Sequence, residues 1–271
     1  MHTTASDGAF TPSQVVALAR QAGLGAVAIT DHDTLAGVGE ARATAPTGLE
    51  VIAAVEITTQ FAEWELHLLG YFVPTDHSGF NALLARLCQQ RRERFHEFIA
   101  RLADMGIRLP ADRVNCVAEA TVSLGRRHVA ELLVANRLAA SRGEAFRRFV
   151  APLTRRVLSK ARFPIQEAIA VVQAVGGVAS LAHPPEALGE AEFTTLSRYG
   201  LGAVEVDYPW KRTSPAQRLR ALARRLDLAV TGGSDCHGAH PNERRIGSHG
   251  ISFEELADLR ERCARPVSPG S

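Results

Sequence analysis

Histidine and carboxylate side chains recur in this sequence beside short apolar runs that have the composition of β-strands. The residues at these positions are His32, Glu56, His67, His183, Asp235 and His237. Neutral imidazoles mixed with carboxylates suit zinc, manganese or iron, whereas calcium and magnesium sites use mainly oxygen ligands. One tetrahedral ion cannot use so many ligands, so the sequence predicts two or three divalent metal ions. The two carboxylate oxygens of Glu56 are suited to bridging a pair of them.

Metal ions held in this way would support hydrolysis of a phosphate ester. A hydroxide bound between two ions would attack phosphorus in line, while the ions neutralise charge on the equatorial oxygens. His237 would assist the leaving oxygen if it is not itself a ligand. Any one of these histidines, taken alone, is more often an ordinary core or surface residue. Their recurrence beside several separate apolar runs is what favours a site.

The apolar runs are predicted to form a largely parallel sheet because helical patterns separate them. The predicted strands are Ala26–Thr30, Val51–Val55, Leu66–Val73, Gly177–Ala182, Gly202–Val206 and Leu228–Gly232. In a parallel barrel the carboxyl ends of the strands meet at one rim, where catalytic groups converge. Most candidate ligands follow a predicted strand. His67 lies near the start of its strand, which indicates that this strand runs the other way.

Residues 75–163 lack the strand pattern and are predicted to be a helical insertion that caps the substrate side of the barrel. Its first helix is expected over Asn81–Met105, where apolar side chains form a stripe along one face. The other face carries Arg91, Arg92 and Arg94, which are expected to be solvent-exposed. The predicted boundaries are 1–74 and 164–265 for the barrel, 75–163 for the insertion and 266–271 for a flexible tail.

Two barrel helices are marked by their end signals. For the first, Thr11 is a candidate N-cap, Pro12 suits the first turn, and Gln14 completes a capping box. Gly23 is expected to end this helix. The second covers Ile165–Ala174 and ends before a glycine pair.

The composition limits the class of protein. The chain has 271 residues, of which 46% are hydrophobic and 22% charged, so a packed core is expected and disorder is not. A formal net charge of +2 argues against binding bulk nucleic acid by charge alone. The four cysteines are far apart and predict reduced thiols. No apolar segment approaches a membrane span and no signal peptide is evident, so a cytoplasmic location is expected.

Six short motifs together resemble the PHP family, named for polymerase and histidinol phosphatase. They are His-Thr-Thr-Ala-Ser-Asp-Gly (2–8), Ala-Ile-Thr-Asp-His-Asp-Thr (28–34), Val-Glu-Ile-Thr (55–58), Glu-Leu-His-Leu-Leu-Gly-Tyr (65–71), Leu-Ala-His-Pro (181–184) and Gly-Gly-Ser-Asp-Cys-His-Gly (232–238). The branch that they resemble most acts on nucleoside 3′,5′-bisphosphates and short RNA 5′ ends. The resemblance implies an α/β fold, a distorted (β/α)7 TIM-like barrel with a helical insertion.

The resemblance also implies a trinuclear metal site and residues that grip the substrate. The implied metal groups are His2, Glu56 and Asp235; Glu56, His67 and His183; and Asp7, His32 and His237. Asp31 and Asp33 would support catalysis by orienting His32. Arg126 and His128 lie in a segment similar to one that the insertion presents toward substrate phosphate in this branch, and they are our candidates for binding a second, non-reacting phosphate. Mn²⁺ is the expected ion, with Zn²⁺ or Fe²⁺ as alternatives.

The sequence departs from the family pattern at two positions that bear on function. The first histidine of the usual His-x-His motif would precede Met1, so we expect a true start upstream or a first metal site with fewer ligands. Arg127 stands where a proline is usual. The expected substrate is a small phosphate ester or a short oligonucleotide, with no stable protein partner and no membrane. Alternatives are a histidinol-phosphate-type phosphatase, a non-catalytic PHP module, and a metal-dependent amidohydrolase or deaminase.

Overall fold

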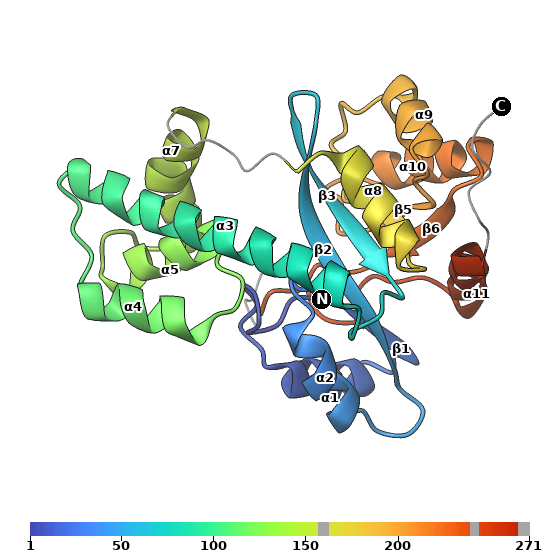
Figure 1. Cartoon of the computed structure of the whole chain (residues 1–271), viewed down its shortest axis with the longest axis horizontal. Coiled ribbons are helices and arrows are strands. Elements are labelled where there is room, and N and C mark those ends of the chain that lie inside the picture. The colour runs from blue at the N-terminus through green and yellow to red at the C-terminus, as the bar shows by residue number, and fades with distance from the viewer. Residues whose placement is uncertain (157–162, 239–243, 265–271) are drawn as a thin grey trace.

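The computed structural model describes residues 1–156, 163–238 and 244–264. In these ranges a curled sheet with helices against it forms one body, and a group of helices extends from it (Figure 1). The end of the chain, including the expected tail over 266–271, lies outside the described residues.

The sheet contains six strands in the described residues, in the order β1-β2-β3-β4-β5-β6. They are β1 (Ala26–Ile29), β2 (Glu50–Phe61), β3 (Trp64–Tyr71), β4 (Val178–Ala182), β5 (Ala203–Asp207) and β6 (Ala229–Gly232). The β2–β3 and β3–β4 pairs are antiparallel and the others parallel. The six predicted strands and the reversed direction of the His67 strand are therefore confirmed. The seven-stranded (β/α)7 barrel is not confirmed, because the described ranges hold a mixed six-stranded sheet.

Strand β2 continues well beyond its predicted end at Val55. It pairs with β3 as a long hairpin in which Glu56 lies opposite Leu69 and Thr58 opposite His67. The β-branched residues after Glu56 favour this extended conformation. Glu56 therefore lies inside a strand, and its side chain is fixed by the pairing on both edges.

The helices around the sheet are α1 (Pro12–Gln21), α2 (Ala36–Thr44), α8 (Ile165–Ala174), α9 (Glu190–Arg198), α10 (Ser214–Arg225) and α11 (Phe253–Glu261), with a short 3₁₀ turn at Arg262–Ala264. The capping box predicted for the first helix is present, with Thr11 and Gln14 each accepting from the other's backbone N–H. Helix α8 has the predicted bounds. Its apolar face packs in the main core together with residues of β2, β3 and β4.

The start of the chain lies between the two ends of the sheet. The backbone N–H of Thr30 donates to the carbonyl of Met1 at 2.9 Å, and that of His2 donates to Cys236 at 3.2 Å. These bonds tie residues on one side to β1 and on the other to the loop after β6. His2 is thereby held close to the motif that contains Asp235.

The predicted insertion is helical and has its own core. It comprises α3 (Ser78–Asp104), α4 (Ala111–Ala120), α5 (Arg126–Ala135), α6 (Arg142–Ala145), the π-helical segment Phe146–Val150 and α7 (Ala151–Arg156). Phe95, Phe98 and Leu102 of α3 are buried in a hydrophobic cluster whose members all lie within this helical group. Helix α3 runs from the sheet into the group (Figure 1), so its two ends have different surroundings.

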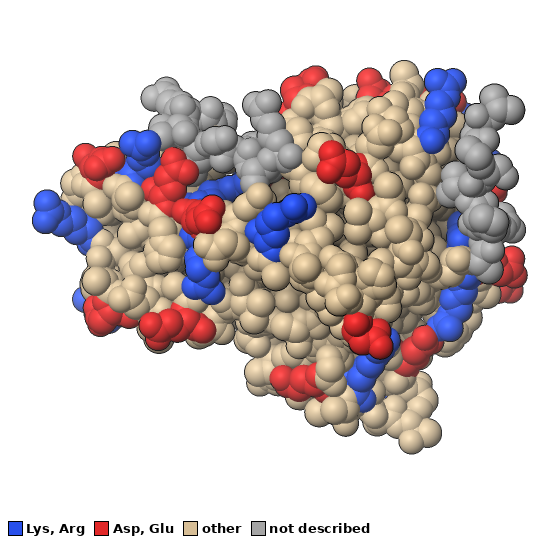
Figure 2. All heavy atoms as spheres, in the orientation of Figure 1, with Lys and Arg blue, Asp and Glu red and all other residues tan. Residues whose placement is uncertain are grey.

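The surface shows no single-sign patch on the face drawn in Figure 2, where the coloured Lys and Arg side chains are interspersed with Asp and Glu. Among the described residues, none of the helices combines the length and apolar character needed to cross a membrane.

Candidate metal centre

Glu56 lies at the centre of a buried group of imidazoles. Its Oε2 is 2.8 Å from Nε2 of His2, and its Oε1 is 2.5 Å from Nδ1 of His67 and 3.2 Å from Nε2 of His183. His32 joins them because it forms a parallel bridge with Glu56, which continues the β1–β2 register. Glu56 is 3% exposed. A carboxylate so enclosed needs cationic partners.

The structure brings the eight implied metal ligands together, from segments that are far apart in the chain. Three groups place their donor atoms within 4.8 Å of one another: His2, Asp7, His32 and His237; His32, Glu56 and His67; and His2, Glu56 and Asp235. The group of His2, Glu56 and Asp235 is one of the implied sets. The group with His67 has His32 in the place of His183, and the group with Asp7 contains an implied set with His2 added. His183 reaches the cluster through its contact with Glu56.

Several donor atoms of this cluster are arranged for a cation. Oδ1 of Asp7 and Nδ1 of His32 are buried and have no hydrogen-bond partner among the described residues. Nδ1 of His237 lies 2.9 Å from the carbonyl of Asp235, which can only accept, so Nδ1 carries the proton. The lone pair of its Nε2 then faces Oδ1 of Asp7 at 3.4 Å. Two lone-pair donors that face each other fit a metal ion between them.

The electrostatics of the cluster favour positive charge. Burial alone would lower the pKa of His2, but hydrogen bonds with Asp235 and Glu56 raise it to about 10. Burial likewise opposes the charge on His183, and its bond with Glu56 raises that pKa to about 9. Burial would raise the pKa of Glu56, yet the surrounding imidazoles hold it well below its usual range. The carboxylates stay ionised and attract protons or divalent cations.

Two candidate ligands of the cluster adopt a backbone conformation that costs energy. His183 has φ = 27° and Asp235 has φ = 50°, in the left-handed region that side chains other than glycine disfavour. His183 directly follows the buried strand β4, and Asp235 lies in the loop after the half-buried strand β6. Such strain is concentrated at functional sites, where the surrounding structure holds the residue in place.

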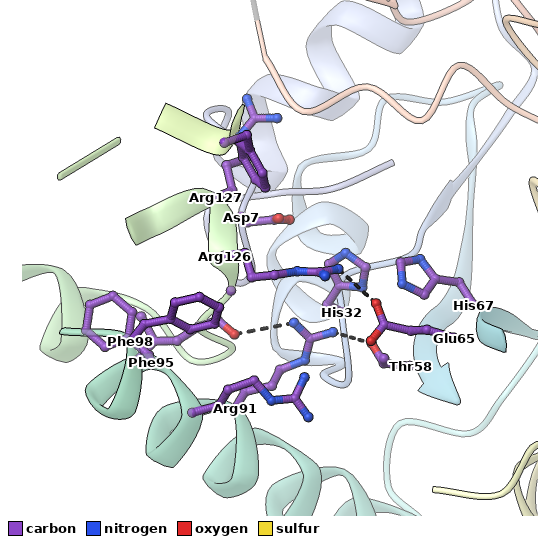
Figure 3. A pocket seen from close by; sticks show the side chains of 14 residues that line it. Asp7, His32, Thr58, Glu65, His67, Arg91, Phe95, Phe98, Arg126 and Arg127 are labelled. Carbon is purple, nitrogen blue, oxygen red and sulfur yellow. Dashed lines mark hydrogen bonds and ion pairs between the residues drawn. The ribbon is translucent and has the colours of Figure 1, made fainter. Parts of the chain in front are cut away.

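A cavity of about 130 Å³ lies between the cluster and the insertion. Its lining includes Asp7, His32 and His67 of the cluster together with Arg91, Arg94 and Arg126. Figure 3 shows the side chain of Arg126 reaching toward His32. Arg126 donates to Oε1 of Glu65 at 2.9 Å across the cavity. Arg94 has neither a hydrogen bond nor an ion pair with the described residues. Burial lowers the pKa of Arg94 and repulsion from Arg91 lowers it further, while attraction to Glu65 opposes the shift.

Comparison with known proteins identifies the family. The profile described as "PHP domain" matches residues 1–133. The chain is 30% identical over 242 residues to the 5′-3′ exoribonuclease of Haemophilus influenzae, which covers 87% of this chain and 88% of that protein. The chain belongs to the PHP family. The resemblance inferred from the motifs is confirmed.

Other relatives of this PHP chain differ in what their names say they act on. It is 28% identical to the phosphoribosyl 1,2-cyclic phosphate 1,2-diphosphodiesterase of Eggerthella lenta, over 91% of this chain and 96% of that protein. It is 25% identical to the 3′,5′-nucleoside bisphosphate phosphatase of Chromobacterium violaceum, over 91% and 88%. A solved structure from Bifidobacterium adolescentis, assigned as a metal-dependent phosphoesterase, is 30% identical with a TM-score of 0.87, covering 96% and 94%.

Asp31 and Asp33 of this PHP domain make contacts other than the expected ones with His32. The carboxylate of Asp31 accepts from the backbone and hydroxyl of Thr3, both at 2.7 Å, and from Ser6 at 2.5 Å. Asp33 accepts from the backbone N–H of Thr58 at 3.2 Å and pairs with Arg91. Asp31 therefore fixes the loop that carries Asp7, and Asp33 joins the sheet to α3.

The expectation that the α3 arginines face solvent is wrong. Arg91 is 15% exposed, and besides Asp33 it donates to Thr58 Oγ1 at 2.6 Å and to the carbonyl of Leu124 at 3.3 Å. Figure 3 shows the bond between Arg91 and Thr58. Arg92 donates to the carbonyl of Ala118 at 2.7 Å. The insertion folds back on α3, so the polar face of this helix is covered.

Arg91→Ala is expected to lower the free energy of unfolding by about 3–5 kcal/mol, because it leaves the buried carboxylate of Asp33 without its cation. Urea denaturation followed by circular dichroism measures this change. Arg86→Ala removes an exposed arginine of the same helix and should change stability by no more than about 0.5 kcal/mol. Equal stabilities of the two variants would show that Arg91 does not anchor the insertion.

The side chain of His128 makes a contact that its expected role in phosphate binding did not include. It is buried, and its Nδ1 accepts from the backbone N–H of Gly125 at 3.0 Å at the start of α5. This bond satisfies a donor at the helix start. His128 thus orients the loop that presents Arg126 to the cavity.

Proposed function

We propose that this PHP domain is a metal-dependent phosphoesterase that hydrolyses phosphate esters of nucleotides. Its substrates would be nucleoside 3′,5′-bisphosphates or the 5′ ends of short RNA. The observation that carries the proposal is the guanidinium of Arg94, which lines the same cavity as His32 and His67 and has no ion pair within the described ranges. Such a cation beside a set of candidate metal ligands suits a substrate with one phosphate at the metals and a second one in the cavity.

Two or three divalent ions would be held by the eight clustered side chains, with Mn²⁺ favoured and Zn²⁺ or Fe²⁺ as alternatives. The ligands would be His2, Asp7, His32, Glu56, His67, His183, Asp235 and His237. When bound, such ions polarise a phosphoryl oxygen and lower the pKa of water to about 7.

Several residues of the chain would position the substrate and the metal ligands. Arg94 and Arg126 would bind the non-reacting phosphate through charge-assisted hydrogen bonds, with Arg126 exchanging its contact with Glu65 for the phosphate. The Nδ1–H of His237 stays with the carbonyl of Asp235, so this ring would serve through Nε2 as a ligand. Asp31 and Asp33 would act indirectly. Asp31 holds the loop that carries Asp7, and Asp33 holds Arg91.

The test is phosphate release from adenosine 3′,5′-bisphosphate by protein that has been stripped with a chelator and refilled with Mn²⁺. Release that requires the metal supports the proposal. Histidinol phosphate and phosphoribosyl 1,2-cyclic phosphate are the comparison substrates. Equal or faster turnover of either would assign a different substrate to this site. No hydrolysis of any of the three by the metal-loaded protein would support a non-catalytic module.

A further inference from the structure

A second group of side chains borders the metal cluster away from the arginine cavity. It consists of Tyr208 and Trp210, which follow β5, and Arg244, which follows β6; we call it the aromatic flank. The ring of Tyr208 lies 5.4 Å from that of His183 and 4.8 Å from that of Trp210. The cavity is instead lined by Asp7, His32 and His67. The two regions therefore approach the cluster through different ligands.

The members of the aromatic flank are held in place. The indole Nε1–H of Trp210 donates to the carbonyl of Val206 at 2.9 Å, which fixes the ring. The guanidinium of Arg244 lies 4.5 Å from the centroid of the Tyr208 ring and donates to Oδ2 of Asp235. Only one of its five N–H groups is needed for that bond. Tyr208, Trp210 and Arg244 all remain partly accessible to solvent.

Aromatic rings with an adjacent arginine are the combination that binds single-stranded nucleic acid, because every base has a face that can stack and every linkage carries a phosphate. A nucleoside bisphosphate has one base and would leave this flank unused when its second phosphate occupies the cavity. A longer RNA continues beyond the phosphate at the metals and needs a surface there.

We propose that the aromatic flank binds the RNA segment on the 3′ side of the hydrolysed linkage, by stacking of bases on Trp210 and Tyr208 and a phosphate contact with Arg244. This inference rests on the proposed function, and it makes short single-stranded RNA a substrate class of the same site. The 5′-terminal nucleotide would lie on the cavity side, with its 5′-phosphate at Arg94 and Arg126.

The test is the ratio of kcat/KM for a 5′-phosphorylated penta-adenylate to that for adenosine 3′,5′-bisphosphate. Trp210→Ala is expected to lower this ratio roughly tenfold, mainly through KM, because one stacking platform is lost. Trp210→Phe keeps a ring and should restore most of the ratio. Phe253→Ala removes an aromatic side chain that is 72% exposed on α11 and should leave the ratio unchanged.

Trp210 also packs against the main core, so the melting temperature of each variant is measured alongside. If Trp210→Ala does not fold, Trp210→Leu keeps apolar packing and removes the stacking face, and the same fall in the ratio is expected. An unchanged ratio in a folded variant that hydrolyses both substrates overturns the role of the flank and leaves the proposed function intact. If the metal-loaded wild-type protein hydrolyses neither substrate, the proposed function is overturned instead.

Discussion

Glu56→Gln is expected to reduce phosphate release from adenosine 3′,5′-bisphosphate by about 1,000-fold or more, and to lower the metal content of the protein. Both oxygens of Glu56 lie against imidazoles, with Oε2 at 2.8 Å from His2 and Oε1 at 3.2 Å from His183. The amide keeps the size of the side chain but removes its negative charge. Glu56 belongs to two of the three groups of candidate metal ligands, so both groups lose that charge. Metal ions contribute several kcal/mol of transition-state stabilisation, and each 1.36 kcal/mol corresponds to a factor of ten.

The measurement is initial phosphate release with saturating Mn²⁺, together with metal content by mass spectrometry on the same sample. Glu167→Gln, which makes the same change at an exposed position of α8, is the control and should retain activity and metal. A Glu56→Gln protein with full metal content and activity within tenfold of wild type would contradict the central role of this carboxylate.

Arg94→Ala is expected to lower kcat/KM for adenosine 3′,5′-bisphosphate by roughly 100-fold, because truncating one partner of a buried charged contact costs about 2–5 kcal/mol. The same variant should hydrolyse 3′-AMP, which lacks the second phosphate, at close to the wild-type rate. Arg94→Lys keeps the charge without the planar guanidinium, and its kcat/KM for adenosine 3′,5′-bisphosphate should lie between those of the wild type and Arg94→Ala. The readout is the ratio of kcat/KM for the two substrates.

The stability of the Arg94 variant separates a binding role from a structural one. Arg94 has no ion pair with the described residues, and burial and repulsion from Arg91 lower its pKa. Removing it should therefore leave the free energy of unfolding unchanged or higher, in contrast with Arg91→Ala. An equal loss of activity on both substrates, or a clear loss of stability, would count against a role in binding the second phosphate.

The local features of this chain followed from its sequence. Short apolar runs located all six strands, and the capping box of Thr11 and Gln14 located the start of α1. The bounds of α8 and the reversed direction of β3 were also predicted. The strands and helix ends depend on neighbours within a few residues, through side-chain periodicity and the hydrogen-bonding needs of helix ends. The direction of β3 followed instead from the place of His67 near the start of its strand. The types and order of the implied ligands sufficed to identify the family.

That the candidate ligands lie close together was shown by the tertiary structure and could not be derived from their spacing in the sequence. His2 reaches Glu56 because the first residues lie between β1 and the loop after β6, held by backbone bonds that leave no pattern in the sequence. The strand count from the sequence was right, whereas the (β/α)7 barrel that the resemblance implied is not confirmed by the mixed six-stranded sheet of the described residues. Asp31 and Asp33 could be named as important, but their partners depend on where distant loops return.

The environment of the α3 arginines was decided by the tertiary structure alone. Periodicity assigned Arg91, Arg92 and Arg94 to a polar face and hence to solvent. The sequence of one helix does not show which later segment of the chain packs against it. Arg91 instead contacts Asp33 and Leu124, which lie far from it on either side in sequence. The insertion folds back and encloses this face, because its own apolar cluster must be buried against α3. As a result Arg94 lines a cavity beside a candidate metal centre, where it has no ion pair with the residues that the structure describes.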